Sequence, residues 1–184
     1  MKRTDNYIKS ISGIGDAFLG VNMNKVIIIG CPGSGKSTFA RKLAEKTGLP
    51  LYYLDMMYWN ADKTTVSKEV FLHRLNNVLS ENEWIIDGNY ASTMELRMSM
   101  CDTIFFLDFD ADVCLSGINE RKGKQRPDMP WIEMEDDEEF LQFIRDYNMN
   151  SRPKVLELLN KHSNKDIFIF KNRNEAEQYI NEIR

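Results

Sequence analysis

The sequence has only three cysteines among its 184 residues, and they stand far apart, at Cys31, Cys101 and Cys114. Neither the even count of a disulfide framework nor the C-x-x-C spacing of a zinc site is found. We therefore expect a reducing, cytoplasmic setting. No run approaches the ~20 apolar residues of a membrane-spanning helix, and no signal-like apolar run follows the N-terminal MKRTDNYIKS. We expect neither membrane insertion nor export.

An excess of basic charge is also lacking, since 24 Lys and Arg residues face 28 Asp and Glu residues, for a formal net charge of -4. Proteins that coat nucleic acid usually carry a strongly basic footprint, and no helix-turn-helix or zinc module is visible. Nucleic acid is therefore not an expected partner, although a local basic groove stays open. Low-complexity tracts are absent as well, so we expect one ordinary globular domain. The sequence leaves the oligomeric state open, and we favour a monomer.

Short apolar runs alternate with amphipathic stretches after residue 22, a pattern typical of a parallel sheet flanked by helices. Strands are expected at residues 25–29, 49–55, 84–87, 103–109 and 166–170. Helices are expected at residues 38–46, 67–80, about 111–120, about 138–160 and about 174–183. Crossovers between parallel strands are right-handed, so the fold class is α/β, with a five-stranded parallel sheet sandwiched by helices and a ligand at the carboxyl ends of the strands.

The first 22 residues show weak periodicity, and Met23 stands directly before the first expected strand. We interpret residues 1–22 as an N-terminal extension, either a flexible arm or an artefact of the chosen start site, and expect no function for it. Residues 23–184 then form a single domain. Within it, the irregular charged stretch at about 121–137 is interpreted as a lid.

The stretch GCPGSGKST, residues 30–38 and here called the phosphate loop, satisfies G-x-x-x-x-G-K-[ST] between a predicted strand and a predicted helix. Its glycines let backbone N–H groups converge on phosphates, and the following helix adds unpaired donors. Lys36 can reach the β- and γ-phosphates, and the Ser37 hydroxyl can bind Mg²⁺. The residues predicted to bind ATP are Gly30, Cys31, Pro32, Gly33, Ser34, Gly35, Lys36, Ser37 and Thr38. Cys31 is interpreted as a small spacer, with an oxidation-sensitive thiol as the alternative.

Two aspartates follow predicted strands. Asp87, in WIIDGNY, emerges at the strand edge beside the phosphate loop, where a carboxylate suits metal binding or orientation of an acceptor; the alternative is a turn formed by Asp-Gly. Asp55, in LYYLDMMYW, can accept a proton from an acceptor hydroxyl, and Tyr58 and Trp59 behind it can stack on a ring. For Asp55 a helix cap with core aromatics is an equal alternative.

Basic residues cluster after the fourth expected strand, at Arg121, Lys122, Lys124 and Arg126. On a flexible loop opposite the phosphate loop, such side chains can close over ATP, exclude water and stabilise transition-state charge. A solvated surface loop is the alternative. Planar guanidinium groups also bind phosphate bidentately, which makes three further arginines candidates: Arg97, Arg145 and Arg152.

The segments MNKVIIIGCPGSGKST, LDMMYW, WIIDGNY, TIFFLDF, GKQRPDMP and RPKVLELL resemble the adenylate-kinase-related P-loop proteins known as DNA topology modulation (FlaR-like) proteins. The resemblance covers nearly all of the chain after residue 22. It implies a nucleoside-monophosphate-kinase-like fold with a lid, which binds ATP and Mg²⁺. It also implies an acidic strand position at Asp87, lid arginines at Arg121 and Arg126, and an acceptor-side arginine at Arg97.

The chain departs from true adenylate kinases at two places. It has Ser37-Thr38 where they have Gly-Thr, and Gly88-Asn89-Tyr90 where they have Gly-Phe-Pro. These departures leave the acceptor open, and hydroxyl groups of small metabolites become candidates. We therefore expect a phosphotransferase that moves the γ-phosphoryl group of Mg-ATP to a small molecule. In this hypothesis Ser37 and Asp87 hold the metal, Lys36, Asp87, Arg121 and Arg126 are catalytic, and Asp55 and Arg97 bind the acceptor. A nucleotide-dependent regulatory protein that affects DNA topology or gene expression is the alternative.

Overall fold

Five parallel strands form one sheet at the centre of the chain in the computed structural model, which describes residues 23–183. The expectations for residues 1–22 lie outside the described residues. The strands are β1 (Lys25–Gly30), β2 (Leu51–Tyr53), β3 (Trp84–Asp87), β4 (Thr103–Leu107) and β5 (Asp166–Phe170). Their spatial order is β2-β3-β1-β4-β5, and every pair is parallel. The predicted five-stranded parallel sheet is thereby confirmed.

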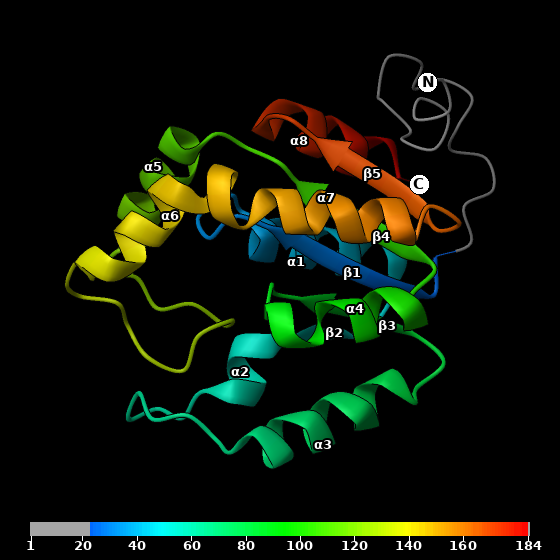
Figure 1. Cartoon of the computed structure of the whole chain (residues 1–184), viewed down its shortest axis with the longest axis horizontal. Helices are drawn as coiled ribbons and strands as arrows, with labels where there is room; N and C mark the ends of the chain where they lie inside the picture. The colour runs from blue at the N-terminus through cyan, green and yellow to red at the C-terminus, as the bar shows by residue number, and fades with distance from the viewer. Residues whose placement is uncertain (1–22, 184) are drawn as a thin grey trace.

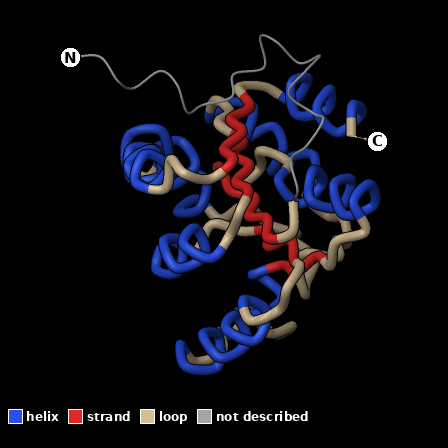
Figure 2. Tube along the Cα trace, turned by 90° about the vertical axis from the view of Figure 1, so that its right-hand side faces the viewer, coloured by secondary structure: helices blue, strands red, loops and turns tan. Residues whose placement is uncertain are grey.

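Helices cover both faces of this sheet. They are α1 (Lys36–Thr47), α2 (Leu54–Tyr58), α3 (Lys68–Leu79), α4 (Ala91–Met100), α5 (Ala111–Arg121), α6 (Glu138–Asn150), α7 (Arg152–Lys161) and α8 (Arg173–Glu182). Helices α1 and α8 pack on one face, together with part of α5 and α6, while α3, α4 and α7 pack on the other (Figure 1). Figure 2 shows the twisted sheet running between the two layers. None of the helices between residues 23 and 183 is long and apolar enough to cross a bilayer.

Strand β1 lies in the middle of the sheet because its side chains are apolar on both faces. Val26 and Ile28 enter the core beneath α1 and α8, whereas Ile27 and Ile29 enter the core beneath α3, α4 and α7. Successive side chains of a strand point to opposite faces, and a parallel sheet is buried on both of them. The phosphate loop therefore emerges from the central strand, and β3 and β4 flank that strand.

The single helix predicted for residues 138–160 is wrong. The structure has two helices, α6 and α7, which meet at Ser151. Pro153 lies in the first turn of α7 and has no N–H to donate to the carbonyl of Met149, so one continuous helix would lose that bond and crowd the proline ring. The predicted strand at residues 49–55 is also too long, because the chain turns into α2 at Leu54.

Candidate active site

The phosphate loop curls tightly between β1 and α1. Gly33 and Gly35 have φ angles of 85° and 93°, a region that side chains other than glycine rarely adopt. The Lys36 ammonium donates a hydrogen bond of 3.0 Å back to the carbonyl of Cys31. Burial lowers the pKa of Lys36, although the negative charge of Asp87 opposes this shift. The Lys36 side chain thus folds back over the phosphate loop.

Helix α5 packs directly on this loop through two glycines. A Cβ added at Gly117 would lie 2.1 Å from the carbonyl oxygen of Gly33, and one added at Gly33 would lie 2.0 Å from the carbonyl oxygen of Cys114. Both obstacles are backbone atoms, which cannot rotate away. The thiols of Cys31 and Cys114 meet at the same contact through a side-chain hydrogen bond, which together with burial raises the pKa of Cys31. This supports the interpretation of Cys31 as a packed spacer.

We expect Gly117→Ala to separate α5 from the phosphate loop and to weaken nucleotide binding. Overpacking of this kind costs about 1–3 kcal/mol, which corresponds to a loss in ATP affinity of about fivefold to 150-fold if the loop takes up the displacement. Isothermal titration calorimetry with ATP would measure it. The control is Ser116→Ala, at an exposed neighbour on the same helix. Equal ATP affinities for the two variants would show that the close contact does not shape the loop.

Asp87 ends β3 next to β1 and is 5% exposed. Its Oδ1 atom is buried and has no hydrogen-bond partner within residues 23–183. Burial raises the pKa of Asp87 to about 6, although the charge of Lys36 and a hydrogen bond with Ser37 act in the opposite direction. The predicted pair of metal ligands, Ser37 and Asp87, is therefore brought together beside Lys36.

Asp55 lies in α2, just after β2, and is aligned by a tyrosine. The Tyr90 hydroxyl donates a hydrogen bond of 2.7 Å to Asp55 Oδ1. Burial raises the pKa of Asp55, while the hydrogen bond from Tyr90 and the charge of Lys36 oppose that shift. The Tyr90 ring also packs on Tyr58, with 5.1 Å between the ring centroids. Both carboxylates that the sequence singled out thus lie within the electrostatic reach of Lys36.

Asn89 joins the segment after β3 to the phosphate loop. Its side-chain amide donates to the carbonyl of Gly30 at 2.6 Å, and its side-chain oxygen accepts from the N–H of Gly30 at 3.1 Å. The pair of bonds fixes the first residue of the loop against the end of β3. Sequence reasoning missed this role, although Asn89 lies within the WIIDGNY segment that was singled out.

Arg97, predicted to contact the acceptor, is 0% exposed in α4. Its guanidinium donates hydrogen bonds to the carbonyls of Gly88, Asn89 and Tyr90. Burial lowers the pKa of Arg97 to about 10, so the group stays charged at neutral pH. We predicted that Arg97 contacts the acceptor. In the structure its buried side chain instead binds the backbone of residues 88–90.

The two predicted lid arginines lie in a network of ion pairs. Arg121 forms a two-pronged contact with Glu133, with 2.9 Å in each prong. Arg126 contacts the same carboxylate at 3.2 Å and donates to Asp128 at 3.0 Å. Asp128 in turn lies 3.6 Å from Arg41 of α1. Ion pairs within the segment between α5 and α6, and one with α1, thus hold this segment in place.

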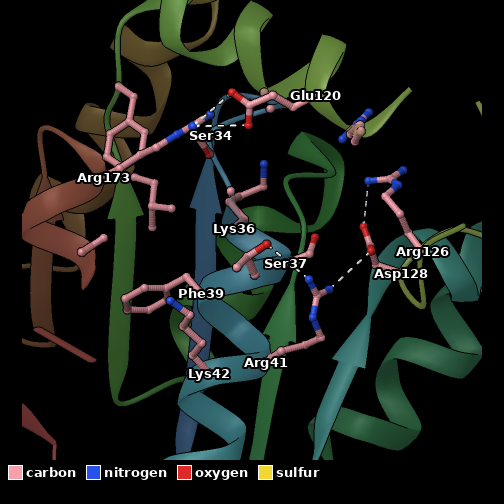
Figure 3. A pocket seen from close by; sticks show the side chains of 18 of the residues that line it. Ser34, Lys36, Ser37, Phe39, Arg41, Lys42, Glu120, Arg126, Asp128 and Arg173 are labelled. Carbon is pink, nitrogen blue, oxygen red and sulfur yellow. Dashed lines mark hydrogen bonds and ion pairs between the residues drawn. The ribbon is translucent and has the colours of Figure 1, made fainter. Parts of the chain in front are cut away.

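A cavity of about 510 Å³ opens above the phosphate loop. Lys36 and Ser37 lie on its floor, Arg126 and Asp128 on one side, and Glu120 and Arg173 at the opposite end (Figure 3). Its size lies within the range of small-molecule sites. The other two candidate arginines lie elsewhere: Arg145 is exposed and paired with Glu138, and Arg152 is paired with Asp108 at a second, smaller cavity.

Comparison with solved structures places the fold. The chain is similar to a shikimate kinase from Acinetobacter baumannii in complex with shikimate, with a TM-score of 0.60 and 19% identity over 88% of this chain and 91% of that one. It is similar to a gluconokinase from Sinorhizobium meliloti 1021, with a TM-score of 0.55 and 14% identity over 87% of this chain and 89% of that one. The chain has the P-loop fold of these kinases.

A second shikimate kinase, from Bacteroides thetaiotaomicron, has the same P-loop kinase fold, with a TM-score of 0.51 and 21% identity over 86% of this chain and 95% of that one. No protein-family model matches the sequence, and no curated protein is similar to it in sequence. Within the P-loop kinase fold, Lys36, Asp87 and Asp55 all lie at the carboxyl edge of the sheet, as expected for ligand-binding residues.

Proposed function

We propose that the protein is a kinase that transfers the γ-phosphoryl group of ATP to a hydroxyl group of a small molecule. The observation that carries the proposal is the meeting of Lys36 in the phosphate loop with two carboxylates, the buried Asp87 and the half-buried Asp55, at one sheet edge. The loop and α1 bind the donor, and the lid, residues 121–137, covers it. The solved kinases of the same fold act on small molecules, which is consistent with this assignment.

The residues at the loop fit a magnesium ion. Asp87 Oδ1 is a buried oxygen without a hydrogen-bond partner among residues 23–183, and the Ser37 hydroxyl lies beside the same carboxylate. No cluster of three or more His, Cys, Asp or Glu suited to a metal is found in that part of the chain, but Mg²⁺ at phosphate sites needs only one or two protein ligands beside phosphates and waters. When bound, Mg²⁺ would neutralise charge on the phosphate oxygens.

The chain's own residues then divide the work. Lys36 neutralises the β- and γ-phosphate oxygens, and Asp55 accepts the proton of the attacking hydroxyl while Tyr90 fixes the direction of its carboxylate. Arg126 and Arg121 stabilise the charge on the phosphoryl group in flight. Arg97 does not contact the substrates and acts by fixing the backbone of residues 88–90. Positioning and electrostatics dominate, since phosphoryl transfer needs little covalent help from a protein.

The test is ATP-dependent ADP formation with a panel of nucleosides, nucleoside monophosphates and hydroxylated metabolites, including shikimate and gluconate. We expect at least one acceptor to stimulate the rate, and Lys36→Ala to abolish the stimulation. Lys46→Ala, which removes an amine from an exposed position near the end of the same helix and outside the cavity, is the matched control and should retain activity. Acceptor-independent hydrolysis alone, across the whole panel, would contradict the proposal.

The finer assignment to the DNA topology modulation proteins, the cytoplasmic location and the monomeric state stay part of this proposal. Three free, buried cysteines in the described part of the chain support a reducing compartment. The regulatory alternative predicts binding to duplex DNA that weakens steeply as salt rises, because phosphate contacts release counterions. No duplex binding at low salt would remove the support for that alternative.

A further inference from the structure

The lid contains a buried carboxylate to which the phosphoryl-transfer chemistry above gives no role. Asp128 is 4% exposed, although the segment around it is largely exposed. Aspartate is almost never buried to this degree unless its charge is paired. It lies on the wall of the cavity, between the guanidinium groups of Arg41 and Arg126 (Figure 3).

Those two guanidinium groups belong to different parts of the fold. Asp128 Oδ2 accepts a hydrogen bond of 3.0 Å from Arg126, which lies in the lid. Asp128 Oδ1 lies 3.6 Å from Arg41, which lies in α1, the helix that begins in the phosphate loop. Arg41 also donates to the Thr38 hydroxyl at 3.2 Å. One carboxylate therefore connects the lid to the last residue of the phosphate loop through a single arginine.

The guanidinium group of Arg126 is fixed from a second side. Its other terminal nitrogen lies 3.2 Å from Glu133, which also binds Arg121. A planar guanidinium held by two carboxylates has little freedom to rotate, so the direction of its remaining donors is set. The charge of Arg126 also reaches the acceptor side, where it opposes the effect of burial on the pKa of Asp55.

We propose that Asp128 is a positioning residue that docks the lid on α1 and orients Arg126 toward the phosphoryl group. This inference rests on the proposed kinase function. Asp128 acts through Arg126 and Arg41 and does not itself contact the transferred group. Without the carboxylate, Arg126 loses one of its two anchors and the lid loses its contact with α1. Water then reaches the phosphates more easily, while the phosphate loop still binds ATP.

The central variant is Asp128→Asn, which keeps the shape of the side chain and removes its charge. We expect kcat with an acceptor to fall by about a hundredfold and the KM for ATP to change by no more than about threefold, because misplacement of a catalytic group affects the transition state more than the ground state. The ratio of acceptor-independent hydrolysis to phosphoryl transfer should rise. Arg41→Met breaks the same bridge from α1, so the double variant should be no worse than the single ones.

The matched control is Asp136→Asn, because Asp136 is an exposed carboxylate of the same segment, paired with Lys122 at 2.7 Å. Limited trypsin digestion after Lys124 reports docking of the lid without any need for turnover. We expect faster cleavage at Lys124 in Asp128→Asn and Arg41→Met than in the wild type, and no change in Asp136→Asn. Asp128→Glu, which keeps the charge, should recover part of kcat.

Three results would overturn the inference: a kcat for Asp128→Asn within about twofold of the wild type, cleavage at Lys124 no faster than in Asp136→Asn, or tighter binding of ATP with an increased kcat. The last would mean that Asp128 competes with phosphate for the arginines. If the wild type phosphorylates no acceptor, the kinase function fails, but the digestion rates still decide whether Asp128 docks the lid. Urea unfolding of each variant shows whether a loss reflects misfolding.

Discussion

Asp87→Asn should lower the acceptor-dependent kcat/KM by about a thousandfold, as expected when a ligand worth several kcal/mol of charge stabilisation is lost. The amide keeps the size of the side chain but cannot supply the anionic oxygen that Asp87 Oδ1 presents beside Ser37. Steady-state ADP formation measures the loss. A variant with more than about a tenth of wild-type activity would place the metal elsewhere.

The same substitution should increase the stability of the fold at neutral pH. Burial raises the pKa of Asp87 from its ordinary value of 3.8 to about 6, so the folded protein binds this proton more tightly than the unfolded chain does. Its contribution to stability is complete below pH 3.8 and is lost as pH rises through about 6. Relative to Asp87→Asn, the wild type should lose about 2 kcal/mol between pH 4 and pH 7.

Urea unfolding of both proteins across this pH range, without nucleotide, measures the difference. Asp108, which follows β4 at the same sheet edge, provides a control of opposite sign. Burial would raise its pKa, but the hydrogen bonds and charges of Arg152 and Lys171 lower it overall. Asp108→Asn should therefore lose stability relative to the wild type as pH rises from acid to neutral. Parallel curves for the wild type and Asp87→Asn would show that Asp87 ionises normally.

Asp55→Asn should lower kcat by at least about a hundredfold, the usual contribution of a general base. The amide keeps the hydrogen bond with Tyr90 but cannot accept the proton of the acceptor hydroxyl. Because burial raises the pKa of Asp55, its protonation should contribute to the fall of the wild-type rate at acid pH, and Asp55→Asn should remove that contribution while the contribution of Asp87 remains. The pH dependence of kcat at saturating substrates measures both effects.

Asp62→Asn, which replaces an exposed aspartate in the loop after α2, is the matched control and should keep wild-type kcat. Tyr90→Phe should give an intermediate loss, since it leaves the base in place and removes only the group that orients it. If Asp55→Asn raised the KM for the acceptor and left kcat unchanged, Asp55 would bind the acceptor without taking its proton.

The strands and the phosphate loop could be predicted from sequence because their signals are local. KVIII, TIFFL and DIFIF are short apolar runs typical of strands in a sheet buried on both faces, and the loop motif lies between such a strand and a helix. Helix α4 gave no such signal, because its buried face includes Thr93 and Arg97 beside Met94 and Met98. Its residues therefore do not form an apolar stripe.

The polar contacts of the site could not be predicted, since each depends on groups that are distant in sequence. Asn89 looks like an ordinary turn residue until Gly30 is placed beside it. Asp128 stands between two prolines in a charged segment, and its burial depends on how that segment packs against Arg41 of α1 while Arg126 pairs with the carboxylate. Arg97 has a guanidinium group suited to binding phosphate. In the structure this group instead donates hydrogen bonds to backbone carbonyls that the turn after β3 directs toward α4.

The turn after β3 also affects how much the site must rearrange when the acceptor binds. Tyr90 adopts φ 37°, a left-handed conformation that costs a residue other than glycine about 1–3 kcal/mol. The carbonyls of Gly88, Asn89 and Tyr90 accept hydrogen bonds from Arg97, so folding itself enforces the strained backbone. The hydroxyl that aligns Asp55 is thus preorganised, and the entropy of ordering it is lost during folding rather than on encounter with the acceptor. We therefore expect Tyr90 and Asp55 to bind the acceptor without rearranging.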